Sequence, residues 1–98
     1  MDKEKTQAFV DENYEKLFVN PLMEFVKVDN LTLMFDPEYL TNGKLDKAIA
    51  VVRDFAADIK IDGLSFHEYK EPGRVPMVAI VVEGASKLNV MVYGHLDK

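Results

Sequence analysis

The sequence predicts an α/β fold in which N-terminal helices are followed by the first three strands of a mixed sheet. In the first part of the chain, apolar residues recur at intervals of three and four, the spacing of one helix face. The last third contains three short runs of β type, of which the middle one, Pro76 to Glu83, is dense in valine and isoleucine. The last two runs are apolar on both faces, as in a sheet covered on both sides. Because two helical segments cannot cover both faces well, we expect an incomplete part of a larger α/β domain.

Residues 1–28 are expected to be helical, in two offset pieces. Asn20-Pro21 predicts a fresh start, because asparagine caps helices well and proline is tolerated at the first helical position. The first piece, from Lys3 to Val19, carries its apolar side chains at helical spacing: Phe9, Val10, Tyr14, Leu17 and Phe18. The second, Leu22 to Lys27, is expected to face inward through Leu22, Phe25 and Val26.

A long loop and a second helical region follow. Residues 29–43 have no clean period and contain Asp36-Pro37 and Asn42-Gly43, which are turn-forming pairs, so we expect a partly apolar loop that serves packing. Residues 44–62 are expected to form a helix that ends near Asp62-Gly63, where glycine can adopt the left-handed cap conformation. Its apolar stripe consists of Leu45, Ile49, Val52, Ala56 and Ile59.

Residues 64–94 are expected to form three strands. Turn-rich stretches of about hairpin length, Glu71 to Arg74 and Gly84 to Lys87, separate them. The three predicted strands are Leu64 to Tyr69, Pro76 to Glu83 and Asn89 to Tyr93.

The composition argues against several classes of function. The chain has 12 basic and 17 acidic residues, a net charge of -5 and no basic cluster, so we expect no nucleic-acid partner. Its longest apolar run, Val75 to Val82, has about eight residues where a membrane span needs about 20, so we expect no membrane partner. The start of the chain has no apolar signal region, and cysteine is absent. We therefore expect a cytoplasmic protein.

The residues with the most chemical potential lie at residues 95–98, where an apolar strand runs through Gly94 into His95-Leu96-Asp97. On an extended backbone His95 and Asp97 point to the same side. Histidines that bind metal almost always give their second ring N–H to a carboxylate or carbonyl. One histidine is nevertheless too few for catalytic zinc, which takes about three protein ligands. From spacing alone, an exposed surface pair is the commoner interpretation.

Other candidate residues favour structural roles. His67 stands beside Glu68, but adjacent strand residues face opposite ways. Arg74 lies in a Pro-Gly-Arg turn, where a solvated side chain is expected. Asp36 and Glu38 flank a proline in a loop and fit turn capping better than acid–base chemistry.

The stretch Tyr93 to Lys98, YGHLDK, resembles the first metal motif of the zinc-dependent metallopeptidase and amidohydrolase family that includes aminoacylase, acetylornithine deacetylase and carnosine dipeptidase. The similarity covers most of the chain from about Leu22 onward. Further matches have the order and spacing of the broad-specificity dipeptidase-like branch: Asn30-Leu31-Thr32, Phe35 to Tyr39, Gly43-Lys44-Leu45 and Pro72 to Pro76. The departures from its usual residues bear on subfamily and specificity: Asp29, Thr32, Leu33, Tyr39 and Val75.

The resemblance implies that His95 ligates one zinc ion of a two-metal site and that Asp97 orients His95. It implies that the chain is the N-terminal part of a three-layer zinc-peptidase-type α/β domain. The implied reaction is hydrolysis of a dipeptide or an N-acyl amino acid amide by water that two zinc ions activate. In the family the other ligands and the general base lie outside these residues. The 98-residue chain alone is therefore expected to be inactive, to bind no zinc tightly and to contain no identifiable substrate-binding residues.

A second interpretation remains open, in which the chain is a small non-catalytic α+β protein-interaction module that associates through exposed sheet edges. If the rest of the sheet is missing, apolar surface is left uncovered. We therefore expect self-association or a homodimer.

Overall fold

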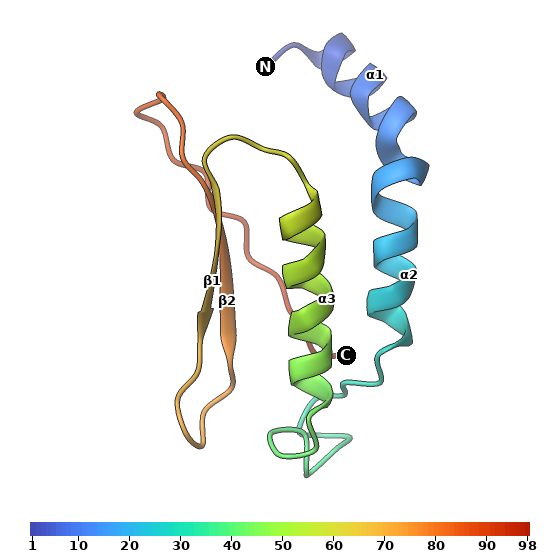
Figure 1. Ribbon diagram of the computed structural model, residues 1–98, viewed down its shortest axis with the longest axis vertical. Helices are drawn as coiled ribbons and strands as arrows, with labels where there is room; N and C mark the ends of the chain where they lie inside the picture. The colour runs from blue at the N-terminus through green and yellow to red at the C-terminus, as the bar shows by residue number, and fades with distance from the viewer.

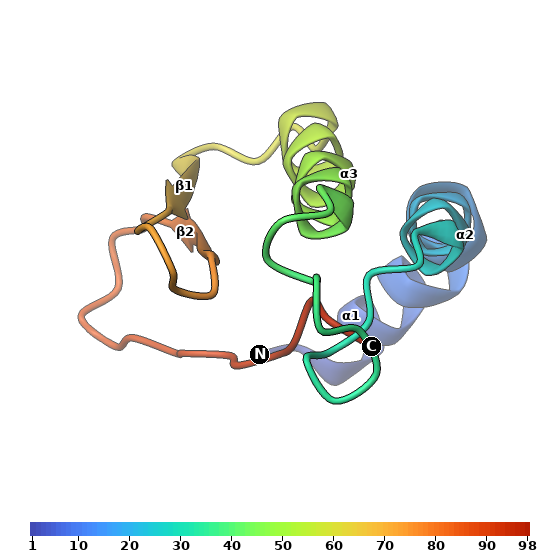
Figure 2. The same cartoon turned by 90° about the horizontal axis from the view of Figure 1, so that it is seen from below.

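A computed structural model describes residues 1–98 and shows three α-helices and a β-hairpin. In both views helix α3, Lys44–Asp58, lies between the hairpin and the N-terminal helical column (Figures 1 and 2). That column consists of α1, Lys3–Asn13, a π-helical stretch η1, Tyr14–Val19, and α2, Asn20–Lys27. The hairpin consists of β1, Leu64–Tyr69, and β2, Met77–Val82. The chain is thus mixed α and β, with a sheet of two antiparallel strands.

The N-terminal column is continuously helical, so the break predicted at Asn20-Pro21 is wrong. Asn20 has helical backbone angles, φ -64° and ψ -49°, and does not act as a cap. Pro21 has no N–H, and its ring would collide with the carbonyl of Leu17, four residues earlier. The wider hydrogen-bonding pattern of the π-helix directly precedes this proline, as is common where an α-helical ladder is interrupted. The helix therefore changes its pattern instead of restarting.

The inward face predicted for α2 is only partly present. Phe25 is half-buried, whereas Leu22 and Val26 are exposed. Helix α2 still packs against α3, and Phe18 of η1 adds a contact, with its ring 6.0 Å from that of Phe55. No side chain of α1 is buried, so this helix extends beyond the packed part of the chain (Figure 1).

Helix α3 confirms the predicted stripe but ends four residues early. Leu45, Ile49 and Ala56 are buried, whereas Ile59 has an extended backbone, φ -71° and ψ 121°. Gly63 has φ +77°, and a Cβ there would lie 2.4 Å from the carbonyl oxygen of Glu83. This glycine therefore serves the turn into β1 and the close approach of the end of β2, rather than the helix end.

The third predicted strand, Asn89 to Tyr93, is wrong. The two observed strands pair from Leu64 with Val82 to Tyr69 with Met77, but the third segment forms no ladder. The side chains of Val90 and Val92 are 89% and 90% exposed. A preference for strand reflects the fit of a side chain to a pleated, half-buried surface. No second layer covers this segment, so its apolar residues have nothing to pack against.

The buried core is small and centred on α3. Its apolar members are Tyr39, Leu45, Ala48, Ile49 and Ala56. The accessible surface is 8323 Å², whereas a compact monomer of 11.2 kDa has about 5,700 Å². The radius of gyration is 15.7 Å, against about 12.6 Å for a compact chain of this length. Much apolar surface therefore stays open to solvent. None of the helices has the length and apolar character needed to cross a membrane.

Candidate metal-ligand site

The segment that contains His95 and Asp97 runs back across the molecule after the hairpin. From Gly84 onward the chain passes behind the hairpin and ends beside the connection that follows α2 (Figures 1 and 2). Two backbone hydrogen bonds join the last residue of this segment to the connection after α2. Lys98 N donates to Asn30 O at 3.0 Å, and Thr32 N donates to Lys98 O at 2.8 Å. This alternation is the pattern of a parallel strand pair. Residues 95–98 are therefore held by a segment from the middle of the chain.

The predicted pairing of His95 and Asp97 is present. His95 Nδ1 lies 3.0 Å from Asp97 Oδ1, which confirms that the two side chains point to the same side. An ionised carboxylate only accepts hydrogen bonds, so Nδ1 carries the proton and Nε2 has the free lone pair. The side chain of His95 is 67% exposed and that of Asp97 is 21% exposed. Asp97 is thus the more buried partner and His95 the more exposed one.

Tyr93, two residues before His95, also lies on this side. Its hydroxyl is 2.9 Å from His95 Nε2, and the two rings meet edge to face with centroids 5.4 Å apart. With Nδ1 protonated, the hydroxyl donates to Nε2. Tyr93 therefore occupies the position from which a metal ion would bind, and its side chain has to turn aside for coordination.

Leu96 points to the opposite side. It lines a mostly apolar hollow of about 450 Å³ between the N-terminal helical column and α3. The other side chains in this hollow include Phe18, Phe25, Val52 and Phe55. Leu96 thus lies against the helices, and His95 also borders this hollow.

Lys98 anchors the end of the segment. Its Nζ donates to the carbonyl of Val28 at 2.7 Å and to Asn30 Oδ1, and it lies 4.2 Å from the ring centroid of Phe25. Desolvation lowers the pKa of Lys98, and the negative charge of Asp29 partly offsets this. The ammonium is therefore held by two oxygens and an aromatic face.

A metal ion at this site would have one candidate ligand residue from this chain, His95, with Asp97 as its orienting carboxylate. No group of three or more histidine, cysteine, aspartate or glutamate side chains comes together anywhere in the structure. The donor set fits one histidine ligand with its orienting carboxylate, which is the arrangement found behind most zinc-bound histidines.

The other sequence candidates have structural partners. His67 Nε2 lies 2.9 Å from Ser65 Oγ, whereas Glu68 pairs with Lys70 at 3.0 Å, so the adjacent pair does not act together. Asp36 caps its turn by accepting from the backbone N–H of Glu38 at 3.1 Å.

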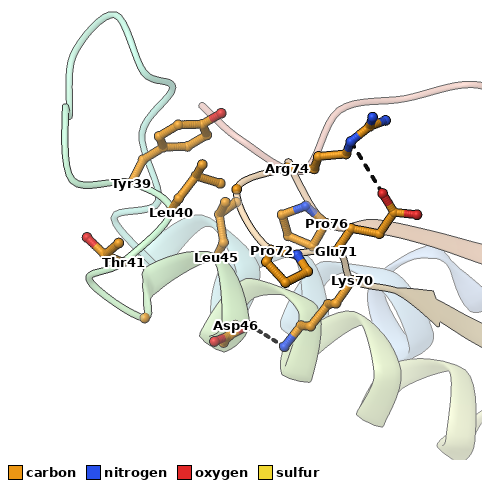
Figure 3. A pocket seen from close by; sticks show the side chains of 12 residues that line it. Tyr39, Leu40, Thr41, Leu45, Asp46, Lys70, Glu71, Pro72, Arg74 and Pro76 are labelled. Atoms are coloured by element: carbon orange, nitrogen blue, oxygen red, sulfur yellow. Dashed lines mark hydrogen bonds and ion pairs between the residues drawn. The ribbon is translucent and has the colours of Figure 1, made fainter.

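Arg74 lines a second hollow of about 540 Å³ between the loop before α3 and the hairpin turn (Figure 3). Its guanidinium lies 3.3 Å from Glu71, and Lys70 lies 2.6 Å from Asp46. Both ion pairs are drawn in Figure 3. Because each cation at this hollow already faces a carboxylate, no free charge is left to recognise a ligand.

Sequence reasoning missed three residues that support the pair: Tyr93, Asn30 and Lys98. Tyr93 could have been found, since it stands two positions before His95 on an extended segment. The role of Asn30 could not have been found from the sequence, because 66 positions separate it from Leu96. Asn30 is 1% exposed, so it lies within the packed part of the structure.

Comparison with protein-family models gave no match. Comparison with curated proteins gave none either.

Proposed function

We propose that this chain supplies a zinc ligand, His95, and its orienting carboxylate, Asp97, to a hydrolase of the metallopeptidase and amidohydrolase type. The observation that carries the proposal is the 3.0 Å contact between His95 Nδ1 and Asp97 Oδ1. It favours the tautomer whose Nε2 is unprotonated, so Nε2 can bind a metal ion once the Tyr93 hydroxyl turns aside. The resemblance of YGHLDK to the first metal motif of that family adds the identity of the metal.

The proposed substrates are dipeptides or N-acyl amino acids, and the proposed setting is the cytoplasm. Bound zinc would polarise the scissile carbonyl and activate water. The residues of this chain contribute position: His95 holds the metal through Nε2, and Asp97 keeps the ring in its orientation and the proton on Nδ1. The general base and the remaining ligands would come from outside these residues, so the chain alone is expected to be inactive.

The uncovered surface supports a role as part of a larger domain. Val90, Met91 and Val92 are almost fully exposed, although their composition is that of a strand covered on both faces. A further layer of the same domain would cover them. A non-catalytic interaction module, in which a partner protein covers this surface, is the alternative, and metal binding separates the two.

The test is a zinc titration of the chain, followed through the ring nitrogens of both histidines by ¹⁵N NMR. We expect zinc to shift His95 Nε2, with an affinity weaker than micromolar because only one ligand residue is present. Replacing the carboxylate in Asp97→Ala should weaken binding about 10- to 100-fold, as the loss of a partner of a metal-bound histidine does. Tyr93→Phe should strengthen binding, because no hydroxyl then competes for Nε2.

The matched control is His67→Ala, which removes the other histidine and should leave the zinc response of His95 unchanged. A zinc response centred on His67, or one that is the same in wild type and Asp97→Ala, would refute the proposal. Submicromolar binding by monomeric chain would contradict the claim that the ligand set is incomplete.

A further inference from the structure

We propose that Asn30 is a positioning residue for the His95–Asp97 pair and acts on it through the backbone of Leu96 and Lys98. Its link to zinc chemistry rests on the function proposed above. Asn30 forms its hydrogen bonds with Leu96 and Lys98, not with His95 or Asp97. It holds Leu96 and Lys98, which alternate with His95 and Asp97 along the segment.

Asn30 makes three hydrogen bonds to this segment. Its side-chain Nδ2 donates to Leu96 O at 2.7 Å, its backbone carbonyl accepts from Lys98 N at 3.0 Å, and its Oδ1 accepts from Lys98 Nζ. These contacts fix the backbone on both sides of Asp97. Asp97 is thereby held between two anchored residues, with its carboxylate at Nδ1 of His95.

Burial makes this arrangement specific. Asn30 is the only buried polar residue of the chain, so water cannot easily replace its amide. A carbonyl left without its donor in such a place loses its hydrogen bond outright. The other backbone hydrogen bond to the segment, from Thr32 N to Lys98 O at 2.8 Å, lies at Lys98 and does not hold the carbonyl of Leu96.

Lys98 determines which way the amide of Asn30 faces. An ammonium can only donate, so the atom that faces Nζ has to be the carbonyl oxygen Oδ1. Nδ2 is then directed at Leu96 O. This polarity makes Asn30→Asp a discriminating substitution, because aspartate keeps the acceptor for Lys98 and removes the donor to Leu96.

The test measures which ring nitrogen of His95 carries the proton, by ¹⁵N NMR at alkaline pH, in the range where the ring shifts no longer change with pH. In the wild type we expect the Nδ1–H form to dominate, because Asp97 accepts from it. Asn30→Asp should lower the ratio of the Nδ1–H form to the Nε2–H form about two- to tenfold, the range that corresponds to one lost hydrogen bond. The matched control is Asn89→Asp, the same chemical change at an exposed asparagine, which should leave the ratio unchanged.

A double-mutant cycle with Asp97→Ala distinguishes positioning from general destabilisation. Once Asp97 is gone, Asn30→Asp should change the ratio no further, because Asn30 acts only through that carboxylate. If Asn30→Asp has lost the helical circular dichroism signal, Lys98→Met provides the test. It leaves the amide of Asn30 unoriented and should shift the ratio in the same direction.

An unchanged ratio in folded Asn30→Asp, or an equal change in Asn89→Asp, would overturn the proposal, as would an unchanged ratio in Lys98→Met. A further effect of Asn30→Asp in the Asp97→Ala background would do the same. No metal is present in these measurements. Failure of the chain to bind zinc would therefore refute the proposed function and leave the role of Asn30 standing. Zinc binding at His95 together with an unchanged tautomer ratio in Asn30→Asp would support the proposed function and refute the role of Asn30.

Discussion

Replacing Val90 and Val92 by glutamate should convert an associating chain into a monomer. Both side chains are almost fully exposed and lie two residues apart in the unpaired segment after the hairpin. Charged side chains on a strand edge are a device by which proteins block edge-to-edge pairing. The double variant also adds two negative charges to a chain of net charge -5, which increases repulsion between copies.

The expected strength of association follows from the uncovered area. The accessible surface of 8323 Å² exceeds that of a compact chain of this mass by about 2,600 Å². If each copy covered half of this excess, a dimer would bury about 2,600 Å² in total, above the roughly 1,600 Å² of a standard stable interface. We therefore expect wild-type chain to form dimers or larger assemblies at micromolar concentrations.

Sedimentation velocity over a range of concentrations measures this directly. The matched control, Gln7→Glu with Asn89→Glu, adds the same charge at two exposed polar positions and should associate as the wild type does. Wild-type chain that stays monomeric at its highest concentration would refute the reasoning, because the exposed apolar surface would then have no tendency to pair. Equal behaviour of the two double variants would show that charge alone, and not the valine surface, controls association.

Two further predictions concern stability. Ile49 is 1% exposed, and Ile49→Ala should cost about 2–5 kcal/mol and lower the melting temperature by at least about 8 °C, whereas Ile80→Ala, at a 45% exposed position, should cost much less. Circular dichroism melts check this, and equal losses would show that α3 does not centre the core. The hydrogen bond between Asp29 and Lys44 lowers the pKa of Asp29 below 3.8 and raises that of Lys44 above 10.5. The resulting stabilisation, small at this exposed pair, is present between these values. It should be lost as pH falls through the lowered pKa or rises through the raised one. Urea denaturation across pH should show that Lys44→Met removes both dependences, and an unchanged profile would contradict this.

Local patterns predicted the parts of the fold that local forces decide. The stripe of Leu45, Ile49 and Ala56 predicted α3, because residues three and four apart share a helix face. The contact between His95 and Asp97 was predicted in the same way, since residues two apart share a side of an extended chain.

The errors arose where partners distant in sequence, or the lack of them, decide the structure. Asn89 to Tyr93 has the composition of a strand, yet a strand forms only where a neighbour accepts its hydrogen bonds and a second layer covers its side chains. The contact of Asn30 with Leu96 likewise left no local signal. The helix break predicted at Asn20-Pro21 was wrong for a different reason, because a helix can continue past a proline by shifting its hydrogen-bond pattern.

The contact between Asn30 and Leu96 spans 66 positions, and this separation affects the order of folding. Closing a loop of that length costs about 4 kcal/mol of chain entropy. The helices and the hairpin need only short-range contacts and can form before that cost is met. His95 and Asp97 can meet at any time, since they are neighbours on one segment. They reach their place beside α3 only when the long loop closes, so we expect the site to be among the last parts to assemble and the first to open.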